Sequence, residues 1–359
     1  MVDSKQAPLD SAAAAKAAFA SVQDKPFPDD IFTAPELRWA VIGCGVIANQ
    51  MAQSLALAGR KLAGVANRTL SKAQAFAEQY GIEKVYESVE DLYADPGIDA
   101  VYITTPHNTH ITYLRDALAA GKHVLCEKAI TLNSAELDEA RAIADEHNVV
   151  LMDATTVLHM PLYQELRRRM DAGDFGHMNL AQLNFGSYKE YGDLTNRFYN
   201  RNLAGGAMLD IGVYALSVMR LFMASQPIEV VSLGNTCETG VDVAGGIVCR
   251  NAEQQLGVVS LTLHSKQPKR SIISFDKCYI EVNEYPRADH ATIVWTADGH
   301  REEVHAGTEA YALCYEMADL EKAVAGDDSK RELLGYASDV MELMTKLRAD
   351  WGVVYPEEE

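Results

Sequence analysis

The sequence has little positive charge for its length. Its 359 residues include 32 Lys and Arg against 51 Asp and Glu, a formal net charge of −19. Such a surface repels phosphate backbones and anionic lipid headgroups, so nucleic acid and membrane partners are not expected. A phosphate-bearing ligand must therefore be held by local groups, namely helix N-termini and individual Arg or Lys side chains.

Ordered cysteine patterns and long apolar runs are also missing. The six cysteines form no CxxC pair and have no His at metal-ligand spacing, so we expect reduced thiols and no metal site. We find no apolar run approaching the ~20 residues that cross a bilayer. Residues 1–35 have neither a basic run nor a twin arginine before their alanine-rich stretch, so we expect no secretory signal and a cytoplasmic protein.

The strand and helix patterns divide the chain into an arm and two domains. From Leu37, short apolar strands alternate with amphipathic helices, which predicts a parallel, doubly covered Rossmann sheet over 37–154. The expected strands are 37–42, 62–66, 100–104, 123–126 and 149–152, and the expected helices are 47–58, 71–80, 108–120 and 133–147. Residues 1–36 form a separate N-terminal arm in this interpretation.

Residues 155–359 follow a different pattern and predict an α+β domain for substrate binding and oligomerisation. Its strands should build a mostly antiparallel open sheet. The expected strands are 228–233, 244–249, 256–263, 271–274, 279–282 and 292–295, and the expected helices are 162–172, 209–223, 310–325 and 330–351. An open sheet leaves one apolar face to be covered, so we expect a homodimer or a higher homo-oligomer.

A glycine-rich turn follows the first predicted strand. It reads Gly43-Cys44-Gly45-Val46-Ile47-Ala48 and opens the first helix, the context of a dinucleotide-binding fingerprint. Gly43 permits the tight turn, and Gly45 lets the backbone approach a pyrophosphate. The backbone of Val46 and Ile47 begins the helix and supplies N–H groups and positive potential.

The end of the second strand indicates which nucleotide is bound. An enzyme that prefers NAD needs an acid there for the ribose 2′-hydroxyl, but this sequence has Asn67 followed by Arg68. Asn67 removes the charge repulsion, and Arg68, with Thr69 and Lys72, can hold a 2′-phosphate through charge-assisted hydrogen bonds. We therefore expect NADP, with NAD less favoured.

Several blocks resemble one known family in order along the chain. They are the Gly43–Ala48 turn, the loop Thr104-Thr105-Pro106-His107-Asn108-Thr109-His110, the run from Gly121 to Lys128, the run from Gly205 to Tyr214, and the ending Trp351–Pro356. Together they resemble the glucose-fructose oxidoreductase / inositol dehydrogenase (Gfo/Idh/MocA) family of NAD(P)-dependent oxidoreductases. The resemblance spans roughly residues 37–356.

The resemblance implies roles for individual residues. The Lys of the family's Glu-Lys-Pro motif lies beside the nicotinamide and the substrate hydroxyl, and here it maps to Lys128, with Ala129 in place of the Pro. The family's Asp and its His or Tyr map to Asp210 and Tyr214. Tyr in the last position resembles the branch of glucose-fructose oxidoreductase and the dimeric dihydrodiol and xylose dehydrogenases, which prefers NADP. The cofactor contacts implied outside the glycine turn are Thr104, Thr105, Pro106, His110 and Glu127.

These residues suit the oxidation of an alcohol. The alcohol carbon loses hydride and its oxygen loses a proton, so a proton acceptor must lie within hydrogen-bond reach. Tyr214 is our candidate, with a pKa lowered by a nearby ammonium. Lys128 would stabilise the developing negative oxygen, and Asp210 would orient the substrate or the other two groups.

Other functions stay open at this point. Some proteins of this fold bind nucleotide without turnover and act as regulators or sensors of sugar metabolism, although such proteins typically lose the catalytic residues. Others keep the cofactor bound and cycle it between two sugars, in which case the N-terminal arm clamps it; the alternative is a loosely docked helix. Thr155, Thr156, Tyr188 and Arg197 are candidate pocket walls. The Trp and Arg usual in the family are not evident in 153–158, so the substrate is left open within sugar-like alcohols, cyclic polyols and their carbonyls.

Overall fold

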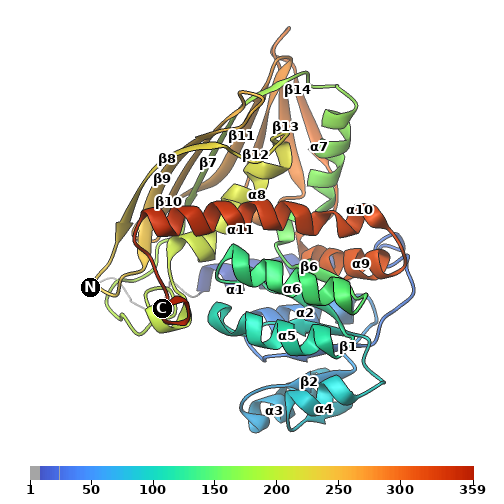
Figure 1. The fold of residues 1–359 in the computed structure, drawn as a ribbon. Coiled ribbons are helices and arrows are strands. Elements are labelled where there is room, and N and C mark those ends of the chain that lie inside the picture. Colours follow the sequence, from blue (N-terminus) through green and yellow to red (C-terminus); the bar gives the residue numbers. More distant parts are fainter. Residues whose placement is uncertain (1–8, 24) are drawn as a thin grey trace. The chain divides into compact units, whose positions relative to one another are not determined.

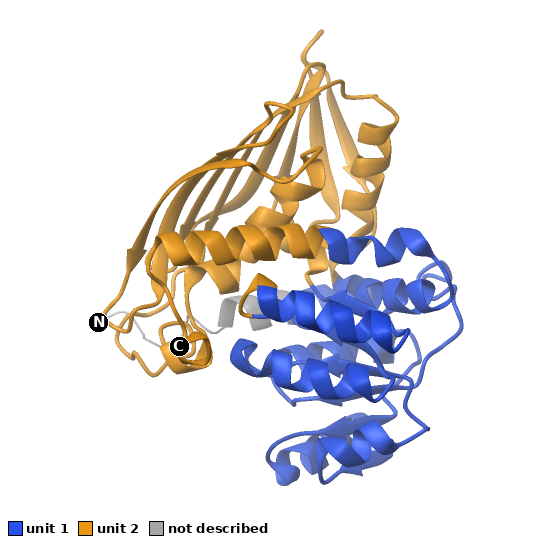
Figure 2. Ribbon diagram, in the orientation of Figure 1, with its two compact units in different colours: residues 1–131, 135–154, 310–335 blue, residues 132–134, 155–309, 336–359 orange. Residues whose placement is uncertain are grey.

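The computed structural model describes residues 9–23 and 25–359; residues 1–8 and 24, which belong to the predicted arm, lie outside the described residues. The chain forms two compact units. Unit 1 contains residues 1–131, 135–154 and 310–335, and unit 2 contains 132–134, 155–309 and 336–359 (Figure 2).

Unit 1 is built on a six-stranded sheet with the order β3-β2-β1-β4-β5-β6, in which every strand pair is parallel. Its strands are β1 (Trp39–Ile42), β2 (Gly64–Ala66), β3 (Lys84–Tyr86), β4 (Ala100–Ile103), β5 (His123–Cys126) and β6 (Leu151–Asp153). Its helices are α1 (Leu9–Val22), α2 (Val46–Leu57), α3 (Leu70–Tyr80), α4 (Val89–Ala94), α5 (His110–Ala119), α6 (Ser134–Glu146), α9 (Ala312–Val324) and α10 (Asp328–Arg331) (Figure 1). The Rossmann prediction is confirmed; β3 and α4 were not predicted.

One face of this sheet packs on a large apolar cluster. Strand residues such as Trp39 and Tyr102 lie there with Met51 of α2, Phe76 of α3 and Met317 of α9. Burial of this surface is the main stabilising term of such a core, about 25 cal/mol for each Å² removed from water. The cluster thereby holds the carboxyl ends of the strands, where the predicted nucleotide residues lie.

Helix α9 differs from the predicted division of the chain. Residues 310–335 group with unit 1, not with the second domain that we assigned to 155–359. Leu313, Met317 and Leu320 of α9 lie in the apolar cluster of unit 1, and a buried carboxylate on α9 also bonds to this unit. Glu321 accepts hydrogen bonds from the indole of Trp39 at 3.0 Å, the backbone of Leu37 at 3.1 Å and the guanidinium of Arg60 at 2.6 Å.

The second half of the predicted arm contacts unit 1 through aromatic rings. The ring of Phe27 lies edge-on to Tyr311 at 5.0 Å, and the guanidinium of Arg60 lies 4.0 Å above the ring of Phe32. Ile31 is buried as well. Residues 25–36 are therefore docked on unit 1 and do not form a separate body.

Unit 2 contains an eight-stranded sheet with the order β14-β13-β12-β11-β7-β10-β9-β8. Only the β7–β10 pair is parallel, so the predicted mostly antiparallel sheet is confirmed. The strands are β7 (Met178–Gly186), β8 (Glu229–Thr236), β9 (Asp242–Arg250), β10 (Leu256–Thr262), β11 (Gln267–Phe275), β12 (Cys278–Asn283), β13 (His290–Trp295) and β14 (Arg301–His305). Its helices are α7 (Pro161–Asp171), α8 (Val213–Phe222) and most of α11 (Leu333–Asp350). Strands β7 and β14 were not predicted.

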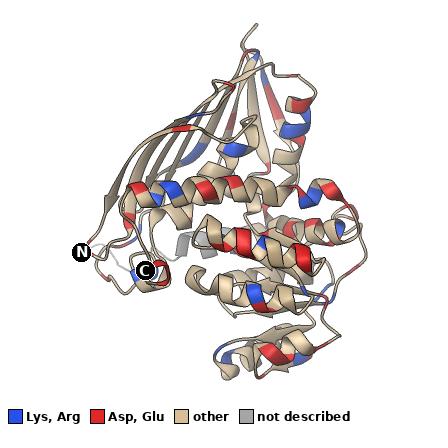
Figure 3. Ribbon diagram, in the orientation of Figure 1, with Lys and Arg blue, Asp and Glu red and all other residues tan. Residues whose placement is uncertain are grey.

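Glycines let Met219 of α8 and Trp351, the residue after α11, approach one face of this sheet closely. A Cβ on Gly234 or Gly245 would meet the Trp351 ring at 2.2 or 2.4 Å, and one on Gly257 would meet the sulfur of Met219 at 2.3 Å. The other face stays open at its β8 end. Charged residues are sparse along β8–β10 (Figure 3).

Candidate active site

The turn after β1 has the geometry of an anion site. Gly43 has φ +103°, and a Cβ there would lie 2.6 Å from the hydroxyl of Thr104, so only glycine fits. Gly45 precedes α2 and makes no side-chain cap, and open space surrounds its Cβ position. Val46 is 71% exposed, and Ile47 is half-buried. The first N–H groups of α2 and the positive end of its dipole are thus left for a ligand anion, which fits a pyrophosphate.

Cations lie near this turn. At the end of β2, the Asn67 amide donates to the carbonyl of Thr69 at 3.0 Å, which shapes the loop, and Arg68 is exposed. Burial raises the pKa of the Cys44 thiol to about 11, and the positive charge of the exposed Lys72 partly opposes that shift. These side chains are available to a phosphate although the protein is strongly acidic.

The loop after β4 lies against the same turn. Thr104 donates to the carbonyl of Ile42 through both its backbone N–H, at 2.9 Å, and its hydroxyl, at 3.0 Å. The hydroxyl of Thr109 lies 2.9 Å from that of Thr105, and Pro106 is exposed. The structure therefore brings Thr104 and its neighbours to the carboxyl edge of the sheet, beside Gly43.

His110 has a different place from the one expected of a cofactor contact. The ring is fully buried; its Nδ1 lies 3.0 Å from the carbonyl oxygen of Ala129, and its Nε2 lies 2.8 Å from that of Thr105. Burial lowers its pKa, against the effect of these backbone partners. Both ring nitrogens are occupied by backbone, so His110 links the loop after β4 to the segment after β5 and presents no polar atom to a ligand.

Glu127 and Lys128 follow β5. The hydroxyl of Tyr102 donates to the Glu127 carboxylate, and the Glu127 backbone N–H donates to Ile103 at 3.0 Å. The Lys128 backbone N–H lies 3.3 Å from Glu127 Oε2, and the Lys128 side chain is half-buried. The peptide bond between Lys128 and Ala129, where the family usually has Pro, is cis. Sequence reasoning missed Tyr102, because no motif marks it.

In unit 2, Asp210 and Tyr214 lie on one continuous helical segment. Its first turn, Met208–Gly212, is π-helical and continues into α8, so the expected regular helix is wound more loosely where Asp210 lies. The Asp210 side chain is 11% exposed, with the guanidinium of Arg197 at 3.4 Å. Tyr214 is half-buried, and its ring centroid lies 6.1 Å from that of Phe185.

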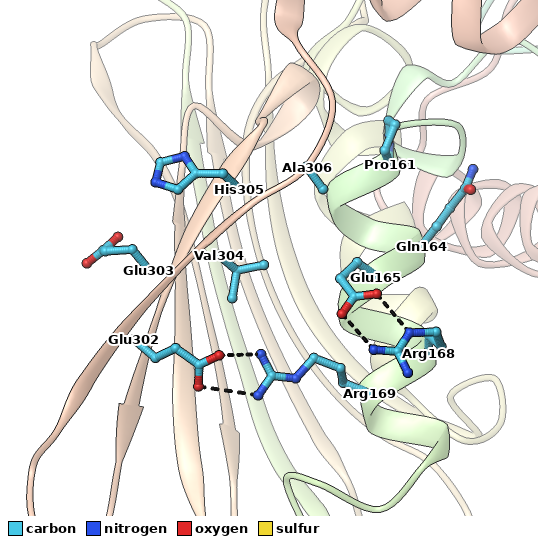
Figure 4. A pocket seen from close by; sticks show the side chains of 10 residues that line it. All are labelled: Pro161, Gln164, Glu165, Arg168, Arg169, Glu302, Glu303, Val304, His305 and Ala306. Atoms are coloured by element: carbon cyan, nitrogen blue, oxygen red, sulfur yellow. Dashed lines mark hydrogen bonds and ion pairs between the residues drawn. The ribbon is translucent and has the colours of Figure 1, made fainter. Parts of the chain in front are cut away.

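The candidate pocket walls divide into two kinds. Thr155 and Thr156 are buried, whereas Tyr188 is 52% exposed and Arg197 pairs with Asp210. A separate open hollow of about 670 Å³ lies between α7 and β14 (Figure 4). None of the predicted site residues line it, and its Arg169 and Arg168 are bonded to Glu302 and Glu165. Both arginines of this hollow are paired with carboxylates of its own lining, so we assign it no ligand.

Two further features of the described residues bear on the sequence predictions. In the part of the chain that the structure describes, no group of three or more His, Cys, Asp and Glu could hold a metal ion. One helical stretch, Arg201–Phe222, is long and apolar enough to cross a membrane, contrary to our expectation of none. Since 83% of its window is buried inside the protein, as in a core helix, it gives a membrane span little support.

Comparisons with known proteins give two family matches. Residues 37–155 match the Gfo/Idh/MocA model described as an oxidoreductase family with an NAD-binding Rossmann fold, and residues 163–281 match the Gfo/Idh/MocA C-terminal domain. Curated relatives include the trans-1,2-dihydrobenzene-1,2-diol dehydrogenases of Mus musculus, 32% identical over 69% of this chain and 75% of the relative, and of Sus scrofa, 28% identical over 90% and 99%.

Solved structures share the fold. KijD10, a 3-ketoreductase from Actinomadura kijaniata solved with NADP and TDP-benzene, has a TM-score of 0.75 at 24% identity, covering 88% of this chain and 98% of that one. A levoglucosan dehydrogenase in complex with NADH and levoglucosan also has a TM-score of 0.75, at 19% identity, covering 86% and 97%. The resemblance to the dihydrodiol dehydrogenase branch is confirmed by the names of the curated relatives. The chain therefore belongs to the Gfo/Idh/MocA family of NAD(P)-binding oxidoreductases.

Proposed function

We propose that this protein is an NADP-preferring dehydrogenase that moves hydride between nicotinamide and a sugar-like or cyclic-diol alcohol or its carbonyl. The observation that carries the cofactor preference is the end of β2, where Asn67 replaces an acid and an exposed Arg68 follows it. A guanidinium binds a 2′-phosphate with charge-assisted, two-point geometry, whereas an acid would repel it. The relatives' diol substrates support the substrate class.

The chain's own residues would share the proton chemistry. A nicotinamide cofactor held at the Gly43–Ala48 turn would supply the hydride acceptor for the alcohol carbon. Tyr214, as its phenolate, takes the hydroxyl proton as the carbonyl forms and becomes the neutral phenol, and the Lys128 ammonium stabilises negative charge on the substrate oxygen. Asp210, beside Arg197, orients the substrate. In the reverse direction Tyr214 returns the proton.

The test is formation of NADPH or NADH on mixing the purified protein with each oxidised cofactor and a panel of aldoses, inositols and cyclic diols. We expect NADPH with at least one alcohol, and loss of turnover on the order of 10³-fold in Lys128→Met with cofactor binding retained. Lys61→Met, which loses a surface lysine paired with Glu83, is the matched control. Full turnover by Lys128→Met would contradict the mechanism.

Two other outcomes favour the alternatives. Cofactor binding without turnover on any panel member would favour a regulator or sensor. Nucleotide that copurifies and does not exchange would favour internal cycling between two substrates; in that case, deletion of residues 1–35 should speed nucleotide release if the arm clamps the cofactor.

We also propose that the protein is a homodimer or higher homo-oligomer through the open face of the unit 2 sheet. Val231 and Leu233 of β8 are 76% and 83% exposed. Val248 of β9, which pairs with Val231, is 48% exposed, and Leu256 of β10, which pairs with Arg250 of β9, is 40% exposed. A contiguous apolar patch of this kind marks an interaction surface. Light scattering should show an oligomer that the double variant Val231→Lys, Leu233→Lys converts to a monomer; a monomeric wild type would defeat the proposal.

A further inference from the structure

The helix that carries Asp210 and Tyr214 has no local capping side chain at its start. The first N–H groups of any helix have no partner within the helix and are usually capped by a nearby Ser, Thr, Asp or Asn side chain. Here the preceding residues are Gly205 and Gly206, which have no side chains. The cap must therefore come from elsewhere in the fold.

Asp242, at the start of β9, supplies it. Its Oδ2 accepts from the backbone N–H of Met208 at 2.6 Å, and the N–H of Ala207 also stabilises the charged form of this carboxylate. The Asp242 side chain is completely buried. A carboxylate that is 34 residues away in sequence thus takes the place of a local capping residue.

The two glycines are required by this arrangement. Gly206 has φ +124°, and a Cβ there would lie 2.3 Å from Asp242 Oδ1. A Cβ on Gly205 would lie 2.6 Å from the carbonyl oxygen of Arg197. The backbone is therefore pressed against the Asp242 carboxylate on one side and against the segment that carries Arg197 on the other.

The end of the chain holds the same segment from another direction. The hydroxyl of Tyr355 donates to the carbonyl of Gly205 at 2.6 Å, and the guanidinium of Arg348 lies 4.7 Å from the centre of the Tyr355 ring. Arg348 is 2% exposed and donates to Glu358 at 2.7 and 2.9 Å. The backbone N–H of Tyr355 donates to the same carboxylate at 3.0 Å.

Charge explains why the buried carboxylate is tolerated. Burial raises the pKa of Asp242 to about 6, while its backbone hydrogen bonds and the charge of Arg348 oppose that shift. The positive end of the helix dipole acts in the same sense as Arg348. Burying this carboxylate lowers the stability of the fold but fixes the first turn of the helix, an arrangement typical of functional sites.

We propose that Asp242 and Tyr355 are positioning residues for Asp210 and Tyr214. Asp242 sets where the π-helical turn begins, and Tyr355 fixes the carbonyl of Gly205 immediately before it. Neither touches substrate; both act by fixing the rotation and start of the helix whose first two turns present Asp210 and Tyr214. The expected effect on turnover rests on the proposed function. The capping of the helix by Asp242 does not depend on it.

The main test compares two tyrosines with equivalent local chemistry. Tyr355→Phe removes the bond to Gly205, and the matched control Tyr163→Phe removes a bond from a fully buried tyrosine hydroxyl to the carbonyl of Tyr285 at 2.7 Å in the same unit. We expect Tyr355→Phe to lower kcat on the order of 10-fold and to shift the pH profile of kcat, with the NADP Kd unchanged. Tyr163→Phe should leave kcat within about twofold. Equal effects of the two changes would overturn the proposal.

The cap is tested at Asp242. In Asp242→Asn, the amide oxygen still accepts from Met208, so kcat should stay within about threefold of the wild type, whereas Asp242→Ala should lose on the order of 30-fold. A loss as large in the Asn variant as in the Ala variant would contradict the capping role.

Hydrogen exchange separates this inference from the proposed function. The amide protons of Ala207 and Met208 should exchange at least 10-fold faster in Asp242→Ala than in the wild type, while amides of β12 in the same unit are unchanged. This readout needs no substrate. If the wild type turns over no panel alcohol, the proposed function fails, and the exchange result still decides the capping; unchanged protection of Met208 would overturn it.

Discussion

Two helices in this protein begin after closely spaced glycines, but the positive potential and free N–H groups at their N-termini have different partners. Helix α2 starts after Gly43 and Gly45 without a side-chain cap, and its N-terminus is open. The helix that leads into α8 starts after Gly205 and Gly206, and the buried carboxylate of Asp242 occupies its N-terminus. The first arrangement admits a ligand anion, and the second excludes one.

The difference shows what a glycine pair before a helix does and does not establish. Glycine permits the close approach of a negatively charged group to the helix N-terminus. Whether that group is a cofactor or a side chain depends on the rest of the fold. In unit 1, no residue in the described chain caps α2 through its side chain, whereas in unit 2 the first residue of β9 does so.

The largest effect we expect concerns the closed helix start, because its carboxylate is buried. The pKa of Asp242 is about 6 in the folded protein, above its ordinary value of 3.8. Its contribution to stability is therefore fully present below about pH 4 and is lost as the pH rises through 6. By linkage this loss reaches about 3 kcal/mol at neutral pH. The side-chain amide of the Asp242→Asn variant does not titrate. The free energy of unfolding of the variant minus that of the wild type should therefore increase by this amount from pH 4 to pH 7.5.

Urea unfolding at several pH values checks this, with Asp276→Asn as a control of opposite sign. Asp276 is exposed, and hydrogen bonds from Asn179 and the His177 backbone lower its pKa, so its contribution is present above its ordinary pKa and is lost as the pH falls. The Asp276→Asn variant should thus lose stability relative to the wild type as the pH rises. Parallel curves for the wild type and Asp242→Asn would show that the Asp242 carboxylate is not a buried titrating group.

The open helix start gives the converse experiment. Gly45 has φ −76° with open space at its Cβ position, so Gly45→Asp fits the backbone and supplies a favoured capping residue. Its carboxylate should take the place of the pyrophosphate and raise the Kd of NADPH on the order of 50-fold, while thermal stability is unchanged or higher. NADPH fluorescence titration measures the Kd.

Gly45→Ser separates charge from bulk at the same position. The serine hydroxyl caps the helix without a negative charge, so the Kd of NADPH should rise much less than in Gly45→Asp. Equal losses in the two variants would mean that steric exclusion, and not the anion site at α2, explains the weaker binding.

The two helix starts also differ in how far the sequence predicts them. The turn from Gly43 to Ala48 is local, and its context of strand, turn and helix is contained in adjacent residues, so both the Rossmann sheet and this site could be predicted. Strand β3 was missed because it has three residues and none of them is buried. Asp242 is a single polar residue at the start of a strand with no motif around it, and only the tertiary fold brings it to Met208.

The domain boundary at α9 also depends on long-range contacts, here those of the buried carboxylate of Glu321. The pattern of residues 310–325 correctly predicts a helix, but a helix pattern does not specify the sheet on which the helix packs. The contacts of Glu321 with Trp39 and Arg60 join residues more than 250 positions apart. The two backbone carbonyl partners of His110 likewise could not be predicted, because any residue type can supply a backbone carbonyl.

The smallest effect concerns selectivity between two cofactors at the open site. Arg68→Ala removes an exposed guanidinium from the end of β2, and an exposed charge-assisted contact is worth about 1.4 kcal/mol or less. We expect the Kd of NADP to rise about 10-fold and the Kd of NAD to stay the same, because NAD has no 2′-phosphate. Adding Asn67→Asp supplies an acceptor for the ribose 2′-hydroxyl, so the double variant should prefer NAD.

The control for this change must account for the net charge of −19. Arg115 on α5 is an exposed arginine of the same unit, paired with Glu139 at 2.7 Å, and Arg115→Ala makes the same change in net charge. At physiological salt the Debye length is about 8 Å, so a distant charge should affect both cofactors weakly and equally. A ratio of NADP to NAD affinity that stays constant in Arg68→Ala would show that the 2′-phosphate is not recognised at the end of β2, and that the open start of α2 binds the pyrophosphate of either dinucleotide without distinguishing between them.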